Sequence, residues 1–508
     1  MKNIIIILTF TLCLFSGCDD VLEQTPITSI PEQEMFNNIE GMQGALVGVY
    51  NSISSSDYYG RLMYAYEGSK GPDFSVDDTG NRFEKENGYG ESSSSGGYAS
   101  DAWNHLYETI HQCNSLLYYI DNTTIEGEDD ELKRIKGETL ALRGLTYFDL
   151  MRLFAYPPIY SCKDGVLYQD KYKYGVPLIT SLKQAKEVLI NPIGRDLADD
   201  CYTHIISDFT SAATLLEGIN PVNGNISFQA VKALLTRAYL YKNDWTNVIT
   251  HGEEAIAAGG SMLPYSSYKT EYYKTFSVEN IWELAYITTD HLSTNSLNYL
   301  VRFPTVNSPG APDDGDIASE TGYAGYRGNK YLRAVLRAEK DGYGEYRDVR
   351  SYLICDNDPG SSTGIRKYVG TEAHYLHNIT MVRLPEIYLS VAEAYAEKDN
   401  LPKAEEFFNV VFKARLDSSY IATDQDQTIS DILTDRRKEL VLEGHNYWDH
   451  FRKAIPFDRE KKGNVSSDND YIDFTLPQVV YPIPQREMEA NPNIREQQNP
   501  GYLPYLTD

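Results

Sequence analysis

Acidic side chains are the most numerous groups in this sequence that could perform catalysis. The chain has 73 aspartates and glutamates among 508 residues. A glycosidase needs two of them facing each other across a cleft, but with so many acids a pair in the sequence does not identify such a cleft. Several glutamates also fall on predicted amphipathic helices, where ion pairs that support the fold are commoner than catalytic roles; these are Glu138, Glu386, Glu393, Glu439 and Glu443. We therefore predict that the protein is not an enzyme.

Two small groups contain the residue types that bind metals. His374 and His377 are three residues apart, which would place both on one face of a helix, but no third ligand lies near them in the sequence. Asp356 and Asp358 belong to an oxygen-rich turn that could hold calcium, although its spacing is not that of an EF-hand. The sequence also lacks an HExxH helix, a Walker-type loop and a GxGxxG turn. We expect no bound metal and no cofactor.

The N-terminus has the form of a cleaved export signal. One lysine precedes an apolar run from Ile4 to Phe15, and Ser16-Gly17-Cys18 then leads into two aspartates. The run is too short to cross a bilayer, and small residues follow it, as at a signal cleavage site. The ending resembles the bacterial lipobox, which implies that residues 1–17 are removed and that Cys18 is acylated; the alternative is an ordinary signal peptide. Acyl chains would hold the mature protein at a membrane.

The charge balance excludes one class of partner. The formal net charge is −27, and no run of lysine and arginine interrupts this acidic character. Such a charge repels phosphate backbones, so we expect no nucleic-acid binding. Beyond Cys18 the chain has four cysteines, Cys113, Cys162, Cys201 and Cys355. They are too few and too scattered for a disulfide framework, so their pairing stays open.

Amphipathic helices make up most of the predicted scaffold. Apolar residues recur at spacings of three and four in eight segments. The predicted helices cover residues 103–120, 132–154, 196–216, 228–241, 245–258, 384–396, 403–416 and 429–442.

Two of the junctions between helices repeat each other. The segment from Arg237 to Trp245 aligns without gaps on the segment from Glu393 to Leu401, and both place a small–aromatic pair before a lysine turn. This pattern resembles the tetratricopeptide repeat. We predict a mainly all-α fold: a tetratricopeptide-like helical-repeat scaffold with long irregular loop insertions and a few short strands. Regions 18–225 and 226–508 are expected to pack together as one domain.

Several motifs together resemble one known family. The segment from Arg383 to Tyr395 reads RLPEIYLSVAEAY and looks like the signature helix of the SusD/RagB family. The segment from Asp435 to His445 is similar to the family helix Arg-x-x-Glu-Leu-x-x-Glu-Gly, with a histidine where the family often has arginine. Further matches span nearly the whole mature chain, at 103–114, 136–148, 174–178 and 481–502.

The resemblance implies a function at the cell surface. Members of the family are nutrient-binding lipoproteins on the outer face of Bacteroidetes-type outer membranes. They cap a TonB-dependent barrel transporter of the SusC/RagA type, capture oligosaccharide (in some cases peptide) and deliver it for uptake. For this chain we therefore expect a lipid-anchored, surface-exposed protein of the outer membrane that takes part in starch or other polysaccharide utilisation.

Ligand contacts in this family come from variable loops, so the residues have to be chosen on their chemistry. Sugar rings stack on aromatic faces, and their hydroxyls bond to Asp, Asn and Arg. The chain has 41 tyrosines but only 4 tryptophans, and all four tryptophans lie on scaffold motifs. We therefore select residues from two predicted loop regions, 58–100 and 291–374. The candidates are Tyr58, Tyr59, Asp73, Asp77, Asn81, Arg82, Tyr89, Tyr98, Tyr323, Tyr326 and Arg327.

Three other functions remain open at this point. A surface-anchored glycoside hydrolase would release product and would lose activity when one carboxylate is changed. A peptide-binding lid of the RagB type would share the scaffold but take a different ligand. An adaptor that binds only protein would show no affinity for saccharides.

Overall fold

The computed structural model describes residues 35–76, 82–301, 323, 325–338, 346–358, 362–365, 367–368, 376–460 and 471–502. Cys18, Asp77, Asn81 and His374 lie outside this part of the chain. Helices dominate the described residues and strands are short, which confirms the predicted fold class. No described helix combines the length and the apolar character needed to cross a membrane.

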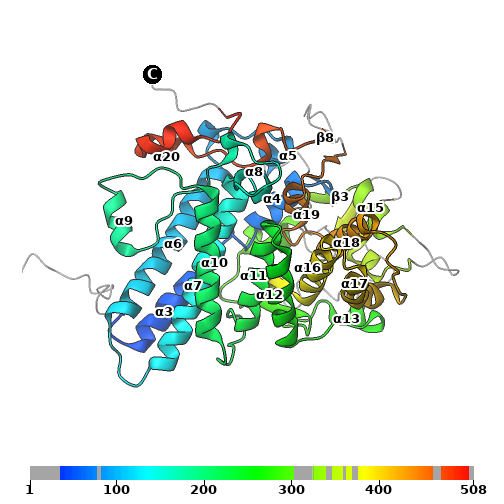
Figure 1. Ribbon diagram of the computed structural model, residues 1–508, viewed down its shortest axis with the longest axis horizontal. Coiled ribbons are helices and arrows are strands. Elements are labelled where there is room, and N and C mark those ends of the chain that lie inside the picture. Colours follow the sequence, from blue (N-terminus) through cyan, green and yellow to red (C-terminus); the bar gives the residue numbers. More distant parts are fainter. Residues whose placement is uncertain are drawn as a thin grey trace, which may run out of the picture.

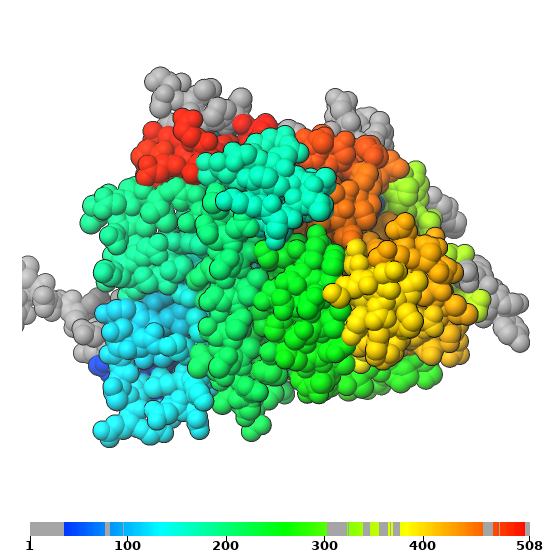
Figure 2. Space-filling model, viewed as in Figure 1, coloured from blue at the N-terminus to red at the C-terminus, as the bar shows by residue number. Residues whose placement is uncertain are grey.

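The long helices stand side by side across the molecule (Figure 1). Helix α3 (Ile39–Ile53) packs on α6 (Tyr98–Asn122) and α7 (Asp129–Phe154), and α7 in turn packs on α10 (Ala198–Leu216). The row continues through α11 (Phe228–Tyr241), α12 (Trp245–Ala257), α16 (Leu384–Glu397), α17 (Leu401–Leu416) and α18 (Gln425–Glu439). In the space-filling view these helices follow one another across the visible face in chain order, from cyan to yellow (Figure 2).

The two repeated junctions fold alike, as the sequence predicts. Asn243 and Asp399 occupy aligned positions, and both adopt a left-handed backbone, with φ of 55° and 58°. The next residue caps the following helix in each case: Asp244 accepts from the Asn247 amide at 3.2 Å, and Asn400 accepts from the Lys403 amide at 3.4 Å. Side-chain caps of this kind satisfy the free amides of a helix start. The α11–α12 and α16–α17 hairpins are therefore two copies of one motif.

Close contact between helices depends on a glycine in α7. A Cβ atom added at Gly137 would lie 2.8 Å from Cγ of Leu216 on α10, well inside van der Waals contact. The absent side chain lets the two helices approach. The segment of α7 that follows, from Gly137 to Phe154, is buried throughout, so α7 forms the centre of the core.

Shorter elements fill the sides of this row. The helices are α4 (Leu62–Lys70), α5 (Glu84–Gly88), α8 (Pro158–Ser161), α9 (Leu182–Val188), α13 (Tyr268–Glu271), α14 (Leu297–Val301), α15 (Lys330–Leu336), α19 (Asn446–Arg452) and α20 (Gln485–Ala490). The strands are β1 (Phe74–Val76), β2 (Asn280–Leu284), β3 (Tyr326–Gly328), β4 (Ile354–Asp358), β5 (Ser362–Ile365), β6 (Ile379–Arg383), β7 (Phe457–Asp458) and β8 (Tyr471–Ile472). They form an antiparallel sheet in the order β1-β3-β5-β4 and two antiparallel pairs, β2–β6 and β7–β8.

The predicted loop region 58–100 is the main error in the fold prediction. It contains α4, and all nine residues of α4 are buried. The abundance of glycine, serine and aspartate in the region indicated a surface loop, but the run Leu62-Met63-Tyr64-Ala65-Tyr66 is apolar enough to enter the core. Only parts of this region therefore remain available to a ligand.

Candidate functional site

Four of the candidate tyrosines are structural, contrary to the sequence prediction. Tyr58, Tyr59, Tyr89 and Tyr326 are all less than 5% exposed. Tyr58 donates to Asp149 Oδ2 at 2.8 Å, Tyr89 donates to the Lys70 carbonyl at 2.7 Å, and Tyr326 donates to the Ala65 carbonyl at 2.7 Å. These three phenols thus satisfy their hydroxyls inside the protein, and the hydroxyl of Tyr59 is buried without a hydrogen-bond partner among the described residues. All four rings fill the core, which leaves no face for a ligand.

Asp73 is also a structural residue and not a ligand contact. It is 1% exposed, it forms an ion pair with Arg437, and it accepts from Asn446 Nδ2 at 2.6 Å. These contacts fasten the start of β1 to α18 and α19. Arg327 lies on β3 opposite Ser75, is half-buried and already has a partner. Asp356 and Asp358 lie within β4, but their side chains are outside the description, so calcium binding there stays a prediction.

The three remaining candidates come together with two residues that the sequence analysis missed. Arg82, Tyr98 and Tyr323 are half-buried at the surface, and they surround Arg61 and Phe83. We call these five residues the arginine–aromatic cluster. Arg61 precedes α4, Arg82 and Phe83 precede α5, and Tyr98 begins α6. Tyr323 precedes β3. Arg61 belongs to no sequence motif. Phe83 is not a tyrosine, the aromatic residue type that was expected to contact the ligand.

Stacking and cation–π contacts build the cluster. The rings of Phe83 and Tyr98 are nearly parallel, at 3°, with centroids 3.9 Å apart. The Arg61 guanidinium lies 5.7 Å from the Tyr98 centroid and 6.0 Å from that of Phe83, and Arg82 lies 4.9 Å from the centroid of Tyr323. All these distances fall in the range of attractive cation–π contact. Phe83 adopts an unfavourable left-handed backbone with φ of 57°, a conformation that bulky residues keep only when their surroundings require it.

A short 3-10 turn orients both arginines. Residues Ser293–Asn295 form this turn. Arg82 Nη1 donates to the Thr294 carbonyl at 2.9 Å, and Arg61 Nη1 donates to Asn295 Oδ1 at 3.3 Å. The turn leaves the flat guanidinium faces against aromatic rings, so the cluster combines apolar ring faces with positively charged hydrogen-bond donors. This combination suits a ligand with both apolar faces and oxygen-rich edges, such as a sugar.

The glutamates predicted to be structural do form ion pairs in the core. Glu386 pairs with Arg237 at 2.7 Å, and Glu393 pairs with Arg452 at 2.6 Å. Glu439 contacts three arginines; although burial opposes its ionisation, the guanidinium groups, that of Arg415 first among them, hold the pKa of Glu439 well below its usual range. Glu138 pairs with Arg134, and Glu443 pairs with Arg383 and Lys367. These ion pairs agree with the structural role predicted for the five glutamates.

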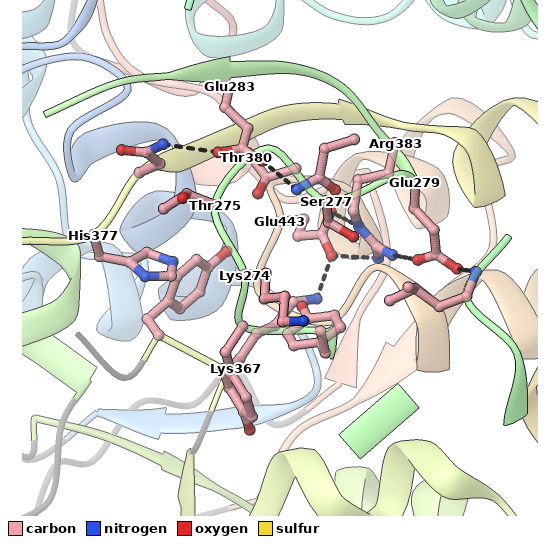
Figure 3. A pocket seen from close by; sticks show the side chains of 16 residues that line it. Lys274, Thr275, Ser277, Glu279, Glu283, Lys367, His377, Thr380, Arg383 and Glu443 are labelled. Atoms are coloured by element: carbon pink, nitrogen blue, oxygen red, sulfur yellow. Dashed lines mark hydrogen bonds and ion pairs between the residues drawn. The ribbon is translucent and has the colours of Figure 1, made fainter. Parts of the chain in front are cut away.

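Figure 3 shows the cavity beside this ionic network. Its volume is about 30 Å³, and its lining includes Glu283, Lys367, His377, Arg383 and Glu443. A cavity of this size holds about two water molecules, which excludes a sugar ring. The charged groups face one another: Arg383 Nη2 lies 2.6 Å from Glu443, and Asn378 Nδ2 donates to Glu283 at 2.9 Å. The cavity is therefore a small polar pocket beside the ionic network of the scaffold.

A larger hollow of about 310 Å³ lies between α18 and α19. Ile429, Leu433 and Ile455 provide apolar walls, and two charged groups of the lining are paired: Arg437 with Asp73, and Asp449 with Arg436 and Arg452. The hollow has the volume of a small-ligand site, and Asp426, Ser430 and Thr434 add polar side chains to its lining, but among the described residues it contains no aromatic ring other than the imidazole of His450.

One group in the described part of the chain has the spacing of a metal site. Ligand atoms of Cys162, Asp164 and Asp199 lie within 4.8 Å of one another. Burial raises the pKa of the Cys162 thiol to about 12, so a metal bound here would have to displace the thiol proton. The expectation of no bound metal therefore stays a prediction.

Comparisons with known proteins agree with the fold and with the sequence motifs. The sequence model of the family described as "SusD family" matches residues 265–502, and that of the family described as "Starch-binding associating with outer membrane" matches residues 22–240. "SusD-like protein P25" of Formosa agariphila is 23% identical over 99% of each chain.

Solved structures give the same result. A SusD superfamily protein from Bacteroides thetaiotaomicron superposes with a TM-score of 0.78 at 26% identity, covering 91% of this chain and 100% of the other. A second one, from Bacteroides vulgatus, superposes with a TM-score of 0.77 at 25% identity, covering 92% of this chain and 100% of the other.

Proposed function

This chain belongs to the SusD/RagB family, and on that premise we propose that it is a surface lipoprotein that binds a glycan and delivers it to a SusC-like barrel transporter. In this proposal Cys18 carries the acyl anchor and the barrel lies in the outer membrane. The description of one matching family, starch-binding and associated with the outer membrane, supports both the ligand class and the location.

The arginine–aromatic cluster is the observation that carries the ligand-binding part of the proposal. It brings two half-buried tyrosine rings together with two arginines that make one hydrogen bond each among the described residues. A sugar ring would stack on Tyr98 or Tyr323, and the guanidinium groups of Arg61 and Arg82 would donate to its oxygens. Both arginines are held from behind by the 293–295 turn, so little order would have to be gained on binding.

The contacts of the carboxylates favour a binding protein over a hydrolase. The glutamates on the family helices are bound by arginine or lysine in the core, and the cluster itself contains no carboxylate. A hydrolase would need a protonated acid and a second carboxylate at the sugar. A glycan that is bound but released unchanged is the expected outcome.

The test is a binding experiment with matched tyrosine variants. Full-length protein in detergent would be run in native gels that contain one polysaccharide each, and retained glycans would be quantified by calorimetry. Tyr98→Ala should weaken binding by about two- to twelvefold, since stacking of one ring on an aromatic side chain contributes about 0.5–1.5 kcal/mol. Tyr118→Ala is the control, because Tyr118 is 44% exposed on the same helix and lies 20 residues away, or about 30 Å along the helix axis.

Three results would contradict the proposal. Equal binding by the Tyr98 and Tyr118 variants would exclude the cluster as the site. Hydrolysis of the bound glycan would favour the hydrolase, and binding of peptides alone would favour the RagB-type lid. Recovery of a β-barrel protein with the full-length lipoprotein in mild detergent tests the partner, and failure to recover one would contradict the transporter part of the proposal.

A further inference from the structure

Arg61 differs from the other buried arginines in lacking a close carboxylate. Eight of the arginines under 9% exposed form ion pairs at 2.9 Å or less: Arg143, Arg152, Arg237, Arg350, Arg383, Arg415, Arg436 and Arg452. Arg195 donates instead to backbone carbonyls, such as that of Gly175 at 2.7 Å. Arg61 is 7% exposed, and its ion-pair partner among the described residues, Asp57, lies 3.7 Å away with a side chain 42% exposed.

The donors of Arg61 are only partly used. Its one hydrogen bond is the long contact of 3.3 Å to Asn295, and its Nε is buried without an acceptor. A buried donor without a partner destabilises a protein by about 1–3 kcal/mol, and more when the group is charged. Burial is the main reason that the pKa of Arg61 is lowered, and the positive charge of Arg82 adds to this effect. Among the described residues, the Arg61 guanidinium therefore lacks a close negatively charged partner.

Arg82 places a second uncompensated charge beside the first. It donates to the Thr294 carbonyl, which is neutral, and its guanidinium rests on the ring of Tyr323. No described carboxylate pairs with it, in a chain whose net charge is −27. Two guanidinium groups close enough to affect each other's ionisation repel, and this repulsion would be relieved by an anion held between them.

From this geometry we propose that the ligand of the arginine–aromatic cluster is an anionic glycan, one that bears uronate carboxylates or sulfate esters. Guanidinium forks bind such groups with two parallel hydrogen bonds, which a neutral hydroxyl cannot offer. The half-buried ring of Tyr98 lies next to Arg61, while Phe83, which is buried, supports it from one face, so one sugar residue can meet the exposed part of Tyr98 and a cation together. This inference rests on the proposed function, because it assumes that the cluster binds a saccharide.

The overall charge of the protein makes the experiment selective. An acidic polysaccharide is repelled by a protein of charge −27, so its retention requires a local cationic site. Full-length protein in detergent would be run through native gels containing polygalacturonate, alginate or carrageenan, and through gels containing starch, xylan or mannan. Uronate and sulfate are then separated by calorimetry with oligogalacturonate against its methyl ester, and with a carrageenan oligosaccharide against its desulfated form.

We expect retention by at least one acidic polysaccharide and binding at least tenfold weaker to its neutralised counterpart. Arg61→Met and Arg82→Met should each weaken this binding by tenfold or more. Lys186→Met, on α9 and exposed, removes the same charge and should leave binding unchanged. Arg82 is half-buried, so its variant remains informative if Arg61→Met does not fold.

Different results would contradict the anionic ligand and the saccharide-binding function. If a neutral polysaccharide binds and neither Arg82→Met nor salt affects its affinity, the anionic ligand is wrong while the proposed function stands. If none of the six polysaccharides is retained, the anionic ligand is wrong and the saccharide-binding function is contradicted as well.

Discussion

Glu67, a buried residue of α4, gives a pH-dependent prediction for stability. Glu67 is 1% exposed, and its Oε2 is buried without a hydrogen-bond partner. Burial, with the charge of Asp73 as a smaller cause, raises the pKa of Glu67 to about 8. The folded protein therefore holds this carboxyl as a neutral acid at pH 7.

The sign of the pH dependence follows from this raised pKa. The folded state binds the proton more tightly than the unfolded state, where the pKa is close to 4.3. The contribution of Glu67 to stability is therefore fully present below about pH 4.3 and is lost as the pH rises toward 8. At pH 7 the loss is about 4 kcal/mol, because each pH unit above the unfolded pKa corresponds to about 1.4 kcal/mol.

Glu67→Gln tests this reasoning because the amide has the shape of the neutral acid and does not titrate. We expect the variant to raise the free energy of unfolding by about 4 kcal/mol at pH 7 and by less than about 1 kcal/mol at pH 4.5, as measured by urea denaturation at both pH values. Glu108→Gln, on the exposed side of α6, is the control and should change neither value. An effect of Glu67→Gln that is equal at the two pH values would refute the reasoning.

Three further predictions concern packing, the ionic core and the anchor. Gly137→Ala should lower the free energy of unfolding in urea by about 1–3 kcal/mol, since its Cβ would meet Leu216 at 2.8 Å. The control is Gly48→Ala, which has nothing within 4 Å of the added Cβ and should stabilise α3 slightly. Equal effects of the two variants would contradict this account of the α7–α10 contact. Glu439→Ala should lower the free energy of unfolding by about 3–5 kcal/mol because three buried arginines lose their common partner; a loss below about 1 kcal/mol would show that the network is not needed. Cys18→Ala should release the protein from membranes in fractionation while glycan affinity stays unchanged, and continued membrane attachment would exclude a lipid anchor at Cys18.

The sequence predicted the scaffold because the information that determines it is local. The spacing of apolar residues fixed the helices to within a few residues, and the alignment of Asn243 with Asp399 located two turns of the same geometry. The motif from Arg383 to Tyr395 identified a helix whose glutamates are paired in the core. The helices and the turns depend on neighbours within one or two helical turns, whereas the partners of the two glutamates, Arg237 and Arg452, are distant in the sequence.

The candidate site was harder to predict because exposure depends on distant partners. Tyr58 is buried through a hydrogen bond to Asp149, 91 residues away, and Tyr326 through a bond to Ala65, 261 residues away. Tyr98 and Tyr323 lie in local sequences similar to those of Tyr58 and Tyr326, but they remain half-buried at the surface. Arg61 was missed because its significance lies in the absence of a close carboxylate, and a sequence does not show that.

A crystal structure of the protein with the glycan that it retains is the most direct test of the central claim. The account predicts a sugar ring against Tyr98 or Tyr323, with an oxygen of the ligand within hydrogen-bond distance of the Arg61 or Arg82 guanidinium. A glycan bound instead in the hollow between α18 and α19, with the arginine–aromatic cluster unoccupied, would contradict it.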